Sequence, residues 1–279
     1  MTPEPIRTPV AGRNLPLAIG VGLGLAVLFI GTLLVDPWAF LVFFTVLAVL
    51  GVSELDHAFR LQGLRPAAGV AYAAAVLCMF GAYAYGPPAQ TLAMVVTVVG
   101  SMASLMLDRQ RTRVTASVAA TCLMVLWVPF LASFVGLLLA RPEHGEWLVM
   151  AAVALTVTND IGAYAIGSRF GRHKLAPGIS PAKSWEGFAG GLGTVVLVAA
   201  FGTSRIPGMD GDVAAAVLLG VAVAVAGTLG DLAESLVKRD LGVKDLGRIL
   251  PGHGGIMERA DAIIFAVPVA HFVFVAVGR

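Results

Sequence analysis

The sequence predicts an all-α, polytopic integral membrane protein with about nine transmembrane helices. Of its 279 residues, 58% are hydrophobic and 13% are charged, and the mean hydropathy is +0.87. Soluble domains are about 45–50% apolar and about 25% charged, and a soluble fold of this size cannot bury so much apolar surface. The composition therefore excludes a soluble enzyme, a disordered chain and a nucleic-acid-binding domain.

Nine runs in the chain are apolar over the roughly 20 residues that a membrane-spanning helix needs. Long continuous runs favour helices, because the strands of a membrane barrel would alternate apolar and polar residues. The first run is too long for a signal-peptide core, so we expect it to be a retained anchor. The nine predicted spans are 15–35, 37–55, 66–85, 89–107, 114–139, 147–168, 187–204, 213–237 and 261–278.

The distribution of Lys and Arg predicts how these spans are oriented. Sixteen of the 19 basic residues fall in alternate connecting segments that start with the N-terminal one, and three fall in the others. Because cytoplasmic segments carry the excess of positive charge, we expect the N-terminus in the cytoplasm and the C-terminus outside. The two longest cytoplasmic segments, 169–186 and 238–260, then hold most of the polar residues.

The chain is predicted to form a single membrane domain over residues 1–279. Polar residues concentrate in its C-terminal half, so we expect the catalytic helices and loops within 141–279. The helices of 1–140 are expected to serve packing, dimer formation or lipid contact.

Ionisable groups inside membrane spans are costly, and each is a candidate for a functional site. Asp160 follows Asn159 in the sixth predicted span, and Thr156, Asp160 and Tyr164 recur at intervals of four residues. Side chains with this spacing share one face of a helix. The stripe forms either a hydrogen-bond network between helices or the wall of a polar cavity open to the cytoplasm, which is the interpretation we favour.

A second polar face ends the eighth predicted span. Asp231, Glu234, Ser235 and Lys238 share this face by their spacing, and Arg239 follows directly. Read alone, the segment also fits a ladder of ion pairs at the membrane surface. Glu258 and Asp261, again three residues apart at the start of the last span, make a functional site the better interpretation.

The segment between these two spans adds cations and a glycine-rich turn. Magnesium prefers carboxylate oxygens and is often shared with substrate phosphates, and exposed backbone N–H groups in glycine turns bind anions. We therefore predict a site for a divalent metal and phosphate, in which His253 either contacts substrate or caps the turn. The residues of this segment are Lys244, Asp245, His253, Gly254, Gly255 and Arg259.

The preceding cytoplasmic segment carries Ser180, Lys183 and Glu186 at intervals of three residues, directly before a glycine-rich span. Its basic residues also fit simple contact with anionic lipid head groups. The regular spacing of the three polar residues favours an ordered loop that binds a nucleotide.

Taken together, these motifs resemble the signature of the phosphatidate cytidylyltransferases, also called CDP-diacylglycerol synthases. The resemblance rests on Asn159-Asp160 with Tyr164, the segment from Ser180 to Gly187, Gly230-Asp231-Leu232 with Glu234-Ser235, and the segment from Lys238 to Asp261. These motifs stand in the family's order within residues 155–265. The first five spans match only as generic apolar helices.

The resemblance implies a bacterial inner-membrane enzyme that makes CDP-diacylglycerol and pyrophosphate from CTP and phosphatidic acid. It also implies a homodimer, a requirement for magnesium and room for a second cation. Transferred position by position, the metal ligands are Asp231, Glu258 and Asp261, and Lys238 and Arg239 face phosphate as catalytic groups. The family usually has Asp where this chain has Glu258, and commonly Lys where it has Ala182.

Two other functions remain open at this point. A related cytidylyltransferase would act on another lipid phosphate, such as an isoprenoid ether lipid. An ion-coupled transporter would use Asp160 and Asp231 as relays within the membrane, but it would leave the glycine-rich turn unexplained.

Overall fold

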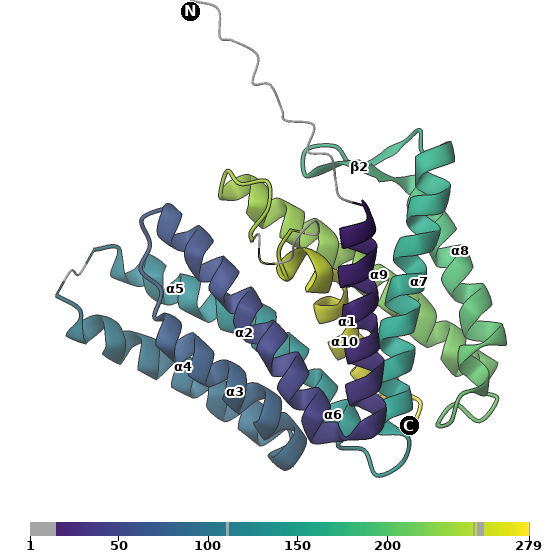
Figure 1. The fold of residues 1–279 in the computed structure, drawn as a ribbon, viewed down its shortest axis with the longest axis horizontal. Helices are drawn as coiled ribbons and strands as arrows, with labels where there is room; N and C mark the ends of the chain where they lie inside the picture. The colour runs from purple at the N-terminus through teal and green to yellow at the C-terminus, as the bar shows by residue number, and fades with distance from the viewer. Residues whose placement is uncertain (1–14, 110–111, 248, 250–253, 279) are drawn as a thin grey trace, which may run out of the picture.

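The computed structural model describes residues 15–109, 112–247, 249 and 254–278. They form a helical bundle with one small sheet (Figure 1). Eight of the described helical segments are long and apolar enough to cross a membrane, and α1 (Leu15–Val35) has the bounds of the first predicted span. The start of α1 and the end of α10 (Met257–Ala276) lie at opposite ends of the bundle (Figure 1). The predicted all-α, polytopic membrane architecture is confirmed.

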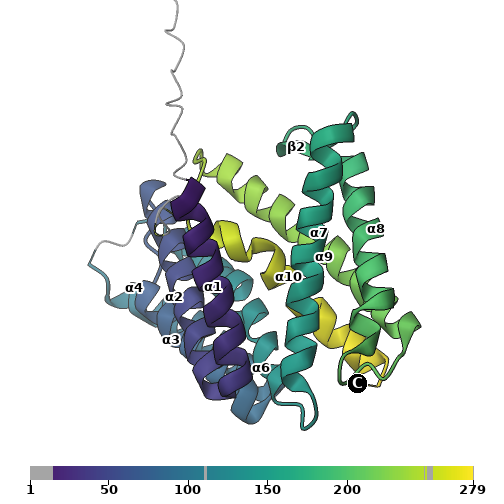
Figure 2. The same ribbon diagram turned by 45° about the vertical axis from the view of Figure 1, so that its right-hand side comes forward.

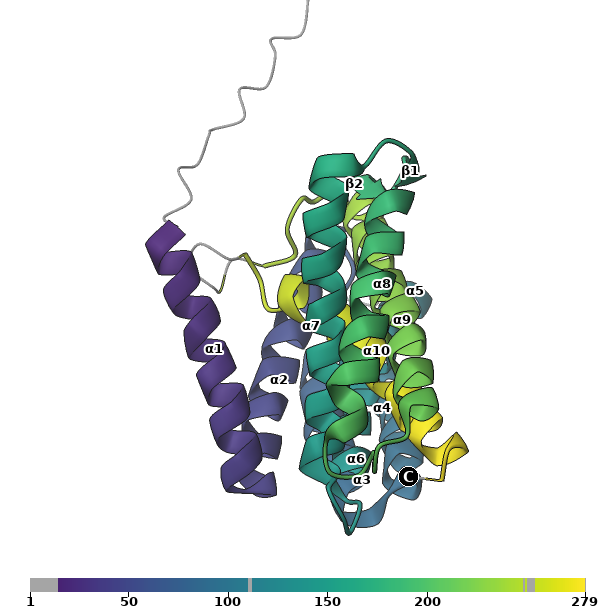
Figure 3. The ribbon, with the colours of Figure 1, turned by 90° about the vertical axis from the view of Figure 1, so that its right-hand side faces the viewer.

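Helix α1 is followed in the N-terminal half by α2 (Pro37–Leu61), α3 (Ala68–Tyr85) and α4 (Pro87–Leu107). Proline opens α2 and α4, where its fixed φ suits a helix and its missing N–H costs no hydrogen bond. Asp36 caps α2 by accepting the N–H of Ala39 at 2.9 Å. Helix α1 packs along α2 at the edge of the bundle (Figure 3).

The fifth span, Val114–Leu139, has the predicted bounds, but its helix is interrupted. Helix α5 (Val114–Val125) leads into a π-helical turn (Leu126–Phe130), and α6 (Phe134–Leu139) completes the span. Pro129 lies inside the π-helical turn. It has no N–H to donate and its ring crowds the preceding turn, which accounts for the irregular backbone.

The C-terminal half consists of α7 (Gly145–Phe170), α8 (Trp185–Phe201), α9 (Val213–Asp240) and α10, with a short 3₁₀ turn (Thr203–Arg205) after α8. Helix α7 packs against α8, and α9 packs against α10. Helix α10 runs obliquely between the N-terminal helices and α7 (Figure 2). It begins four residues before the predicted span, so Glu258 lies in its first turn.

A two-stranded hairpin connects α7 to α8, and the sequence analysis had not predicted it. Strand β1 (Lys174–Ala176) pairs with β2 (Ser180–Ser184) in an antiparallel ladder. Ser184 ends the hairpin and caps α8, because its hydroxyl accepts the N–H of Gly187 at 3.1 Å. The hairpin thereby holds β2 beside the first turn of α8.

Candidate active site

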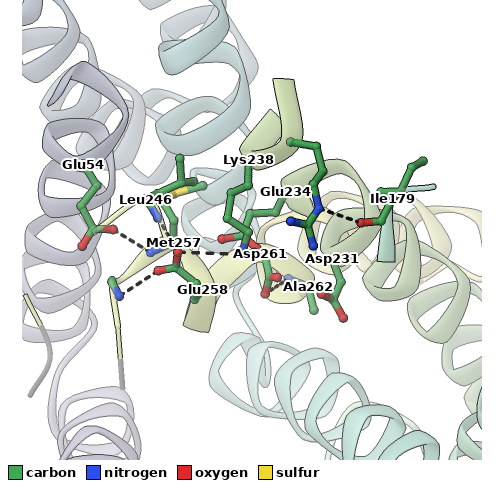
Figure 4. A network of polar contacts seen from close by, with 12 residues as sticks. Glu54, Ile179, Asp231, Glu234, Lys238, Leu246, Met257, Glu258, Asp261 and Ala262 are labelled. Carbon is green, nitrogen blue, oxygen red and sulfur yellow. Dashed lines mark hydrogen bonds and ion pairs between the residues drawn. The ribbon is translucent and has the colours of Figure 1, made fainter. Parts of the chain in front are cut away.

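Three carboxylates from two helices meet beside this hairpin (Figure 4). Asp231 and Glu234 lie one turn apart on α9, and Asp261 lies in the second turn of α10. One oxygen of each carboxylate lies within 4.8 Å of the other two. Glu234 is only 2% exposed and Asp261 only 8%. Carboxylates buried this close together are costly unless cations or protons offset their charge.

Glycine allows the two helices to come together at this point. A Cβ atom on Gly230 would overlap the carbonyl oxygen of Asp261 and would lie 3.0 Å from the Cβ of Phe265. A residue with a side chain would therefore push α9 away from α10 and separate Asp231 from Asp261. In the Gly230-Asp231 pair, the glycine allows the close packing of the two helices and the aspartate contributes a carboxylate to the cluster.

Two lysines supply positive charge to the cluster. Lys183 of β2 forms an ion pair with Asp231, so the hairpin is joined directly to α9. Lys238 lies one turn after Glu234, with its Nζ 2.5 Å from Oε2 of Glu234 and 3.8 Å from Oε1 of Glu258. Two ammonium groups thus lie against a cluster of three carboxylates and can offset two of their charges.

The donor set fits a divalent cation that prefers oxygen, such as magnesium. Besides the three converging carboxylates, Oε1 of Glu234 is buried and has no hydrogen-bond partner in the described part of the chain. An unpaired buried carboxylate oxygen is unfavourable, and a metal ion would satisfy it. Asp231, Glu234 and Asp261 are therefore the residues that fit a metal here.

A cavity of about 540 Å³ opens beside the cluster, between α7, α8, α9 and the hairpin. Its wall includes most of the polar residues that the sequence singled out in α7 and the hairpin. Oδ1 of Asn159 is buried, has no hydrogen-bond partner among the described residues and lies close to Gly191 of α8. The predicted site residues on the wall are Asn159, Asp160, Ser180, Lys183 and Asp231.

Glu258 lies apart from the three converging carboxylates. Its oxygens accept the backbone N–H groups of Leu246 and Gly255, at 2.7 and 2.8 Å. Gly255 lies directly before Ile256, so Glu258 satisfies a backbone N–H just outside the start of α10. From the sequence, Glu258 was expected to be a metal ligand. In the structure Glu234, not Glu258, lies with Asp231 and Asp261, and Glu258 binds backbone N–H groups of the segment before α10.

The predicted anion cradle at the glycine turn needs a correction at Gly255. The N–H of Gly255 already donates to Glu258, so it does not face a phosphate in this arrangement. Gly254 has a positive φ of 87°, a conformation that glycine adopts without strain. His253, the third predicted member of the turn, lies outside the described residues.

Glu186 and Arg239 both make contacts with the segment between α7 and α8. The carboxylate of Glu186 accepts the backbone N–H groups of Arg172 and His173, at 3.1 and 3.2 Å, and pairs with Nδ1 of His173 at 2.6 Å. Nε of Arg239 donates to the carbonyl of Ile179 at 3.4 Å (Figure 4). Both side chains hold this segment in place.

The remaining predicted residues lie around the cluster without forming it. Ser235 is half-buried on α9, and Lys244 and Asp245 are exposed between α9 and α10. Arg259 is exposed on the first turn of α10. The roles of these four residues in substrate binding stay predictions.

Two carboxylates at or near the site were not predicted as such from the sequence. Glu234 had been placed on the same helix face as Asp231 but was not assigned to the metal. Glu54, on α2, accepts the N–H groups of Ile256 and Met257, both at 3.0 Å. It falls inside a predicted span, so the criterion that singled out Asp160 applied to Glu54 as well.

The fold and the site together define a class of protein: a multi-spanning membrane protein with carboxylates and lysines gathered beside a polar cavity. The sequence profile described as the cytidylyltransferase family matches residues 17–277. The chain belongs to the cytidylyltransferase family.

Relatives of known name align over most of the chain. The phosphatidate cytidylyltransferase of Mycobacterium bovis is 37% identical over 92% of this chain and 87% of its own length. That of Mycobacterium leprae is 35% identical over 94% of this chain and 88% of its own. That of Staphylococcus aureus is 32% identical over 89% of this chain and 95% of its own.

Proposed function

We propose that the protein condenses CTP with phosphatidic acid to form CDP-diacylglycerol and pyrophosphate. The relatives that bear the name phosphatidate cytidylyltransferase cover nearly the whole chain. The observation that carries the proposal is the carboxylate cluster of α9 and α10, which adjoins a polar cavity and contacts two lysines. Carboxylates that can hold a metal ion and lysines that can bind phosphate oxygens suit substrates with charged phosphates.

Asp231, Glu234 and Asp261 would hold magnesium. When bound, the metal ion supplies charge neutralisation for the phosphates of CTP. Lys183 and Lys238 lie against two of these carboxylates, which places their ammonium groups where they would stabilise phosphate oxygens as well. Asp160, on the cavity wall, would orient the bound nucleotide.

The reaction needs little covalent participation from the protein. An oxygen of the phosphatidic acid phosphate bonds to the α-phosphorus of CTP, the bond from this phosphorus to the bridging oxygen breaks, and pyrophosphate leaves with that oxygen. The nucleophile is already an anion, so no strong general base is required. Alignment of the reactants and stabilisation of the charge by Lys183 and Lys238 are what the chain contributes.

The lipid substrate needs an apolar approach to the same helix. A groove of about 390 Å³, lined almost wholly by apolar side chains, lies between α5, the π-helical turn, α9 and α10. Ala233 and Val237 of α9 and Phe265 of α10 line it. On α9, the two groove residues lie next in sequence to Glu234 and Lys238. We propose that an acyl chain of phosphatidic acid lies in this groove.

The proposal also locates the protein in a bacterial inner membrane with the site facing the cytoplasm. The hairpin and the segment between α9 and α10 lie at one end of the bundle (Figure 1), and both belong to the segments richest in Lys and Arg. The homodimer and a second cation stay predictions, to be tested by the mass of the detergent-free particle and by counting bound metal ions.

The test is a reconstitution. Purified full-length protein in lipid nanodiscs should convert radiolabelled CTP and phosphatidic acid to CDP-diacylglycerol, with release of pyrophosphate, only when magnesium is added. Absence of product with every lipid phosphate tried would refute the assignment as a cytidylyltransferase acting on lipids. Faster turnover with an isoprenoid ether lipid phosphate would show that this lipid, and not phosphatidic acid, is the preferred substrate.

A further inference from the structure

Glu54 is a buried carboxylate in the N-terminal half of the chain, and nothing in the proposed chemistry uses it. It lies on α2 and is 3% exposed. Its two oxygens accept the N–H groups of Ile256 and Met257, more than 200 residues away in sequence. Figure 4 shows the contact with Met257. These two donors are the residues at which α10 begins.

A helix start exposes backbone N–H groups that have no partner within the helix. Helix α10 has no side-chain cap at Ile256, the residue before its first turn. Glu54 supplies that cap from another helix, and its negative charge is favourable at the positive end of the helix dipole. Burial without partners would be costly for this carboxylate, and the two N–H groups satisfy it.

The segment before α10 is shaped around the same carboxylate. A Cβ atom on Gly247 would overlap the carboxyl group of Glu54, and one on Gly255 would lie 2.6 Å from both of its oxygens. Neither glycine has a positive φ, so space and not backbone conformation excludes a side chain at these positions. The absence of a Cβ atom is what lets both segments close over Glu54.

Packing around this contact ties α2 to the catalytic helices. Val52 and Leu55 of α2 share a buried apolar cluster with Leu246 and Met257. At the end of α2, Nε2 of Gln62 donates to the carbonyl of Leu241, directly after α9, at 2.7 Å. Helix α2 therefore contacts the end of α9 and the start of α10, which are the two helices that contribute the carboxylate cluster.

We propose that Glu54 is a positioning residue that fixes the start of α10, so that Asp261 meets Asp231 and Glu234. Asp261 lies four residues after Met257, about 6 Å further along the helix axis. A shift or loosening of the first turn is thus transmitted almost undiminished to Asp261. Its catalytic consequence rests on the proposed function, whereas its effect on cation binding does not.

The first test measures the contact itself. Hydrogen–deuterium exchange on the full chain in nanodiscs should show faster exchange at Ile256 and Met257 in Glu54→Gln, by at least tenfold. Glu54→Asp keeps the charge and should recover part of the protection. Asp56→Asn makes the same chemical change two residues away, at a side chain that pairs with Arg60 at 2.8 Å, and should exchange like the unaltered protein.

The second test measures the consequence without turnover. Mn²⁺ replaces Mg²⁺ as a probe because it also prefers oxygen ligands, and its binding is followed by electron paramagnetic resonance. Glu54→Gln should weaken Mn²⁺ binding at least fivefold, with partial recovery in Glu54→Asp and no change in Asp56→Asn. A general loss of folded protein would lower the number of sites and leave the affinity of the remaining ones unchanged.

Gly247→Ala tests the same contact without altering Glu54, because the three atoms nearest to its new methyl group all belong to the Glu54 side chain. It should weaken Mn²⁺ binding as well, since the methyl group displaces the carboxylate. Unchanged exchange at Ile256 and Met257, or unchanged Mn²⁺ affinity in Glu54→Gln, would overturn the proposal. Failure of the unaltered protein to form CDP-diacylglycerol would refute the proposed function alone, because both readouts here are independent of CTP and lipid.

Discussion

Lys183 of the hairpin and Asp231 of α9 form an ion pair that joins two segments 48 residues apart in sequence. Both side chains are partly exposed, and such pairs contribute only about 0–1 kcal/mol to stability. The pair is thus better explained by chemistry than by folding, because it places a cation between the polar cavity and the carboxylate cluster.

Lys183→Met should therefore impair catalysis far more than folding. We expect kcat/KM for CTP to fall by about 100-fold or more, the usual effect of removing a group that stabilises developing charge, with Tm nearly unchanged. Lys174→Met is the control, since Lys174 is an exposed cation of the paired strand. Activity within threefold of the unaltered protein would show that Lys183 does not act on substrate.

The two glutamates of the site should respond differently to the same substitution. Glu234→Gln removes a charge from the converging carboxylates and should raise the magnesium concentration for half-maximal activity at least about tenfold. Glu258→Gln alters a side chain that binds backbone N–H groups, so it should lower Tm and shift the magnesium requirement less. A larger shift in Glu258→Gln would restore Glu258 as the metal ligand.

Gly230→Ala tests the close approach of α9 and α10. Overpacking of a tight interface usually costs about 1–3 kcal/mol, so thermal unfolding in detergent should occur several degrees earlier, with loss of activity. Gly193→Ala is the matched control, because a Cβ atom at Gly193 meets nothing within 4 Å. That change should stabilise α8 slightly, since Ala favours helix by about 1 kcal/mol over Gly. Equal behaviour of the two variants would contradict the packing role of Gly230.

Ala233→Trp should fill the apolar groove and hinder the lipid but not the nucleotide. We expect KM for phosphatidic acid to rise at least fivefold while KM for CTP stays within twofold. Leu229→Trp is the control on the same helix, because Leu229 is exposed and does not line the groove. If KM for the lipid is unchanged in Ala233→Trp, the acyl chain lies elsewhere.

The spans were predictable because each is an apolar run long enough to cross a bilayer, a property that neighbours in space do not alter. Their breaks and ends were less so. Pro129 was visible in the sequence, but the sequence did not reveal that the backbone around it forms a π-helical turn. Helix α10 begins four residues before the predicted span. At that point Glu54 accepts the N–H groups of Ile256 and Met257.

Most residues of the site could be predicted from the sequence, but which of their side chains contact one another could not. Helical spacing placed Asp231 and Glu234 on one face, and the order of motifs indicated that α9 and α10 act together. Spacing does not measure the gap between two helices, however. It therefore did not reveal that Glu258 turns back to Gly255 while Glu234 faces Asp261.

By itself, the sequence determined the membrane class, the succession of spans and the group of residues that carry charge into them. These properties follow from the free-energy cost of placing polar groups in hydrocarbon, which depends mainly on each residue's own side chain and backbone. Only the tertiary structure decided which charges meet. Gly230 sets how closely α9 approaches α10, and Glu54, from a helix far away in sequence, caps the start of α10 and holds Asp261 within reach of the other two carboxylates.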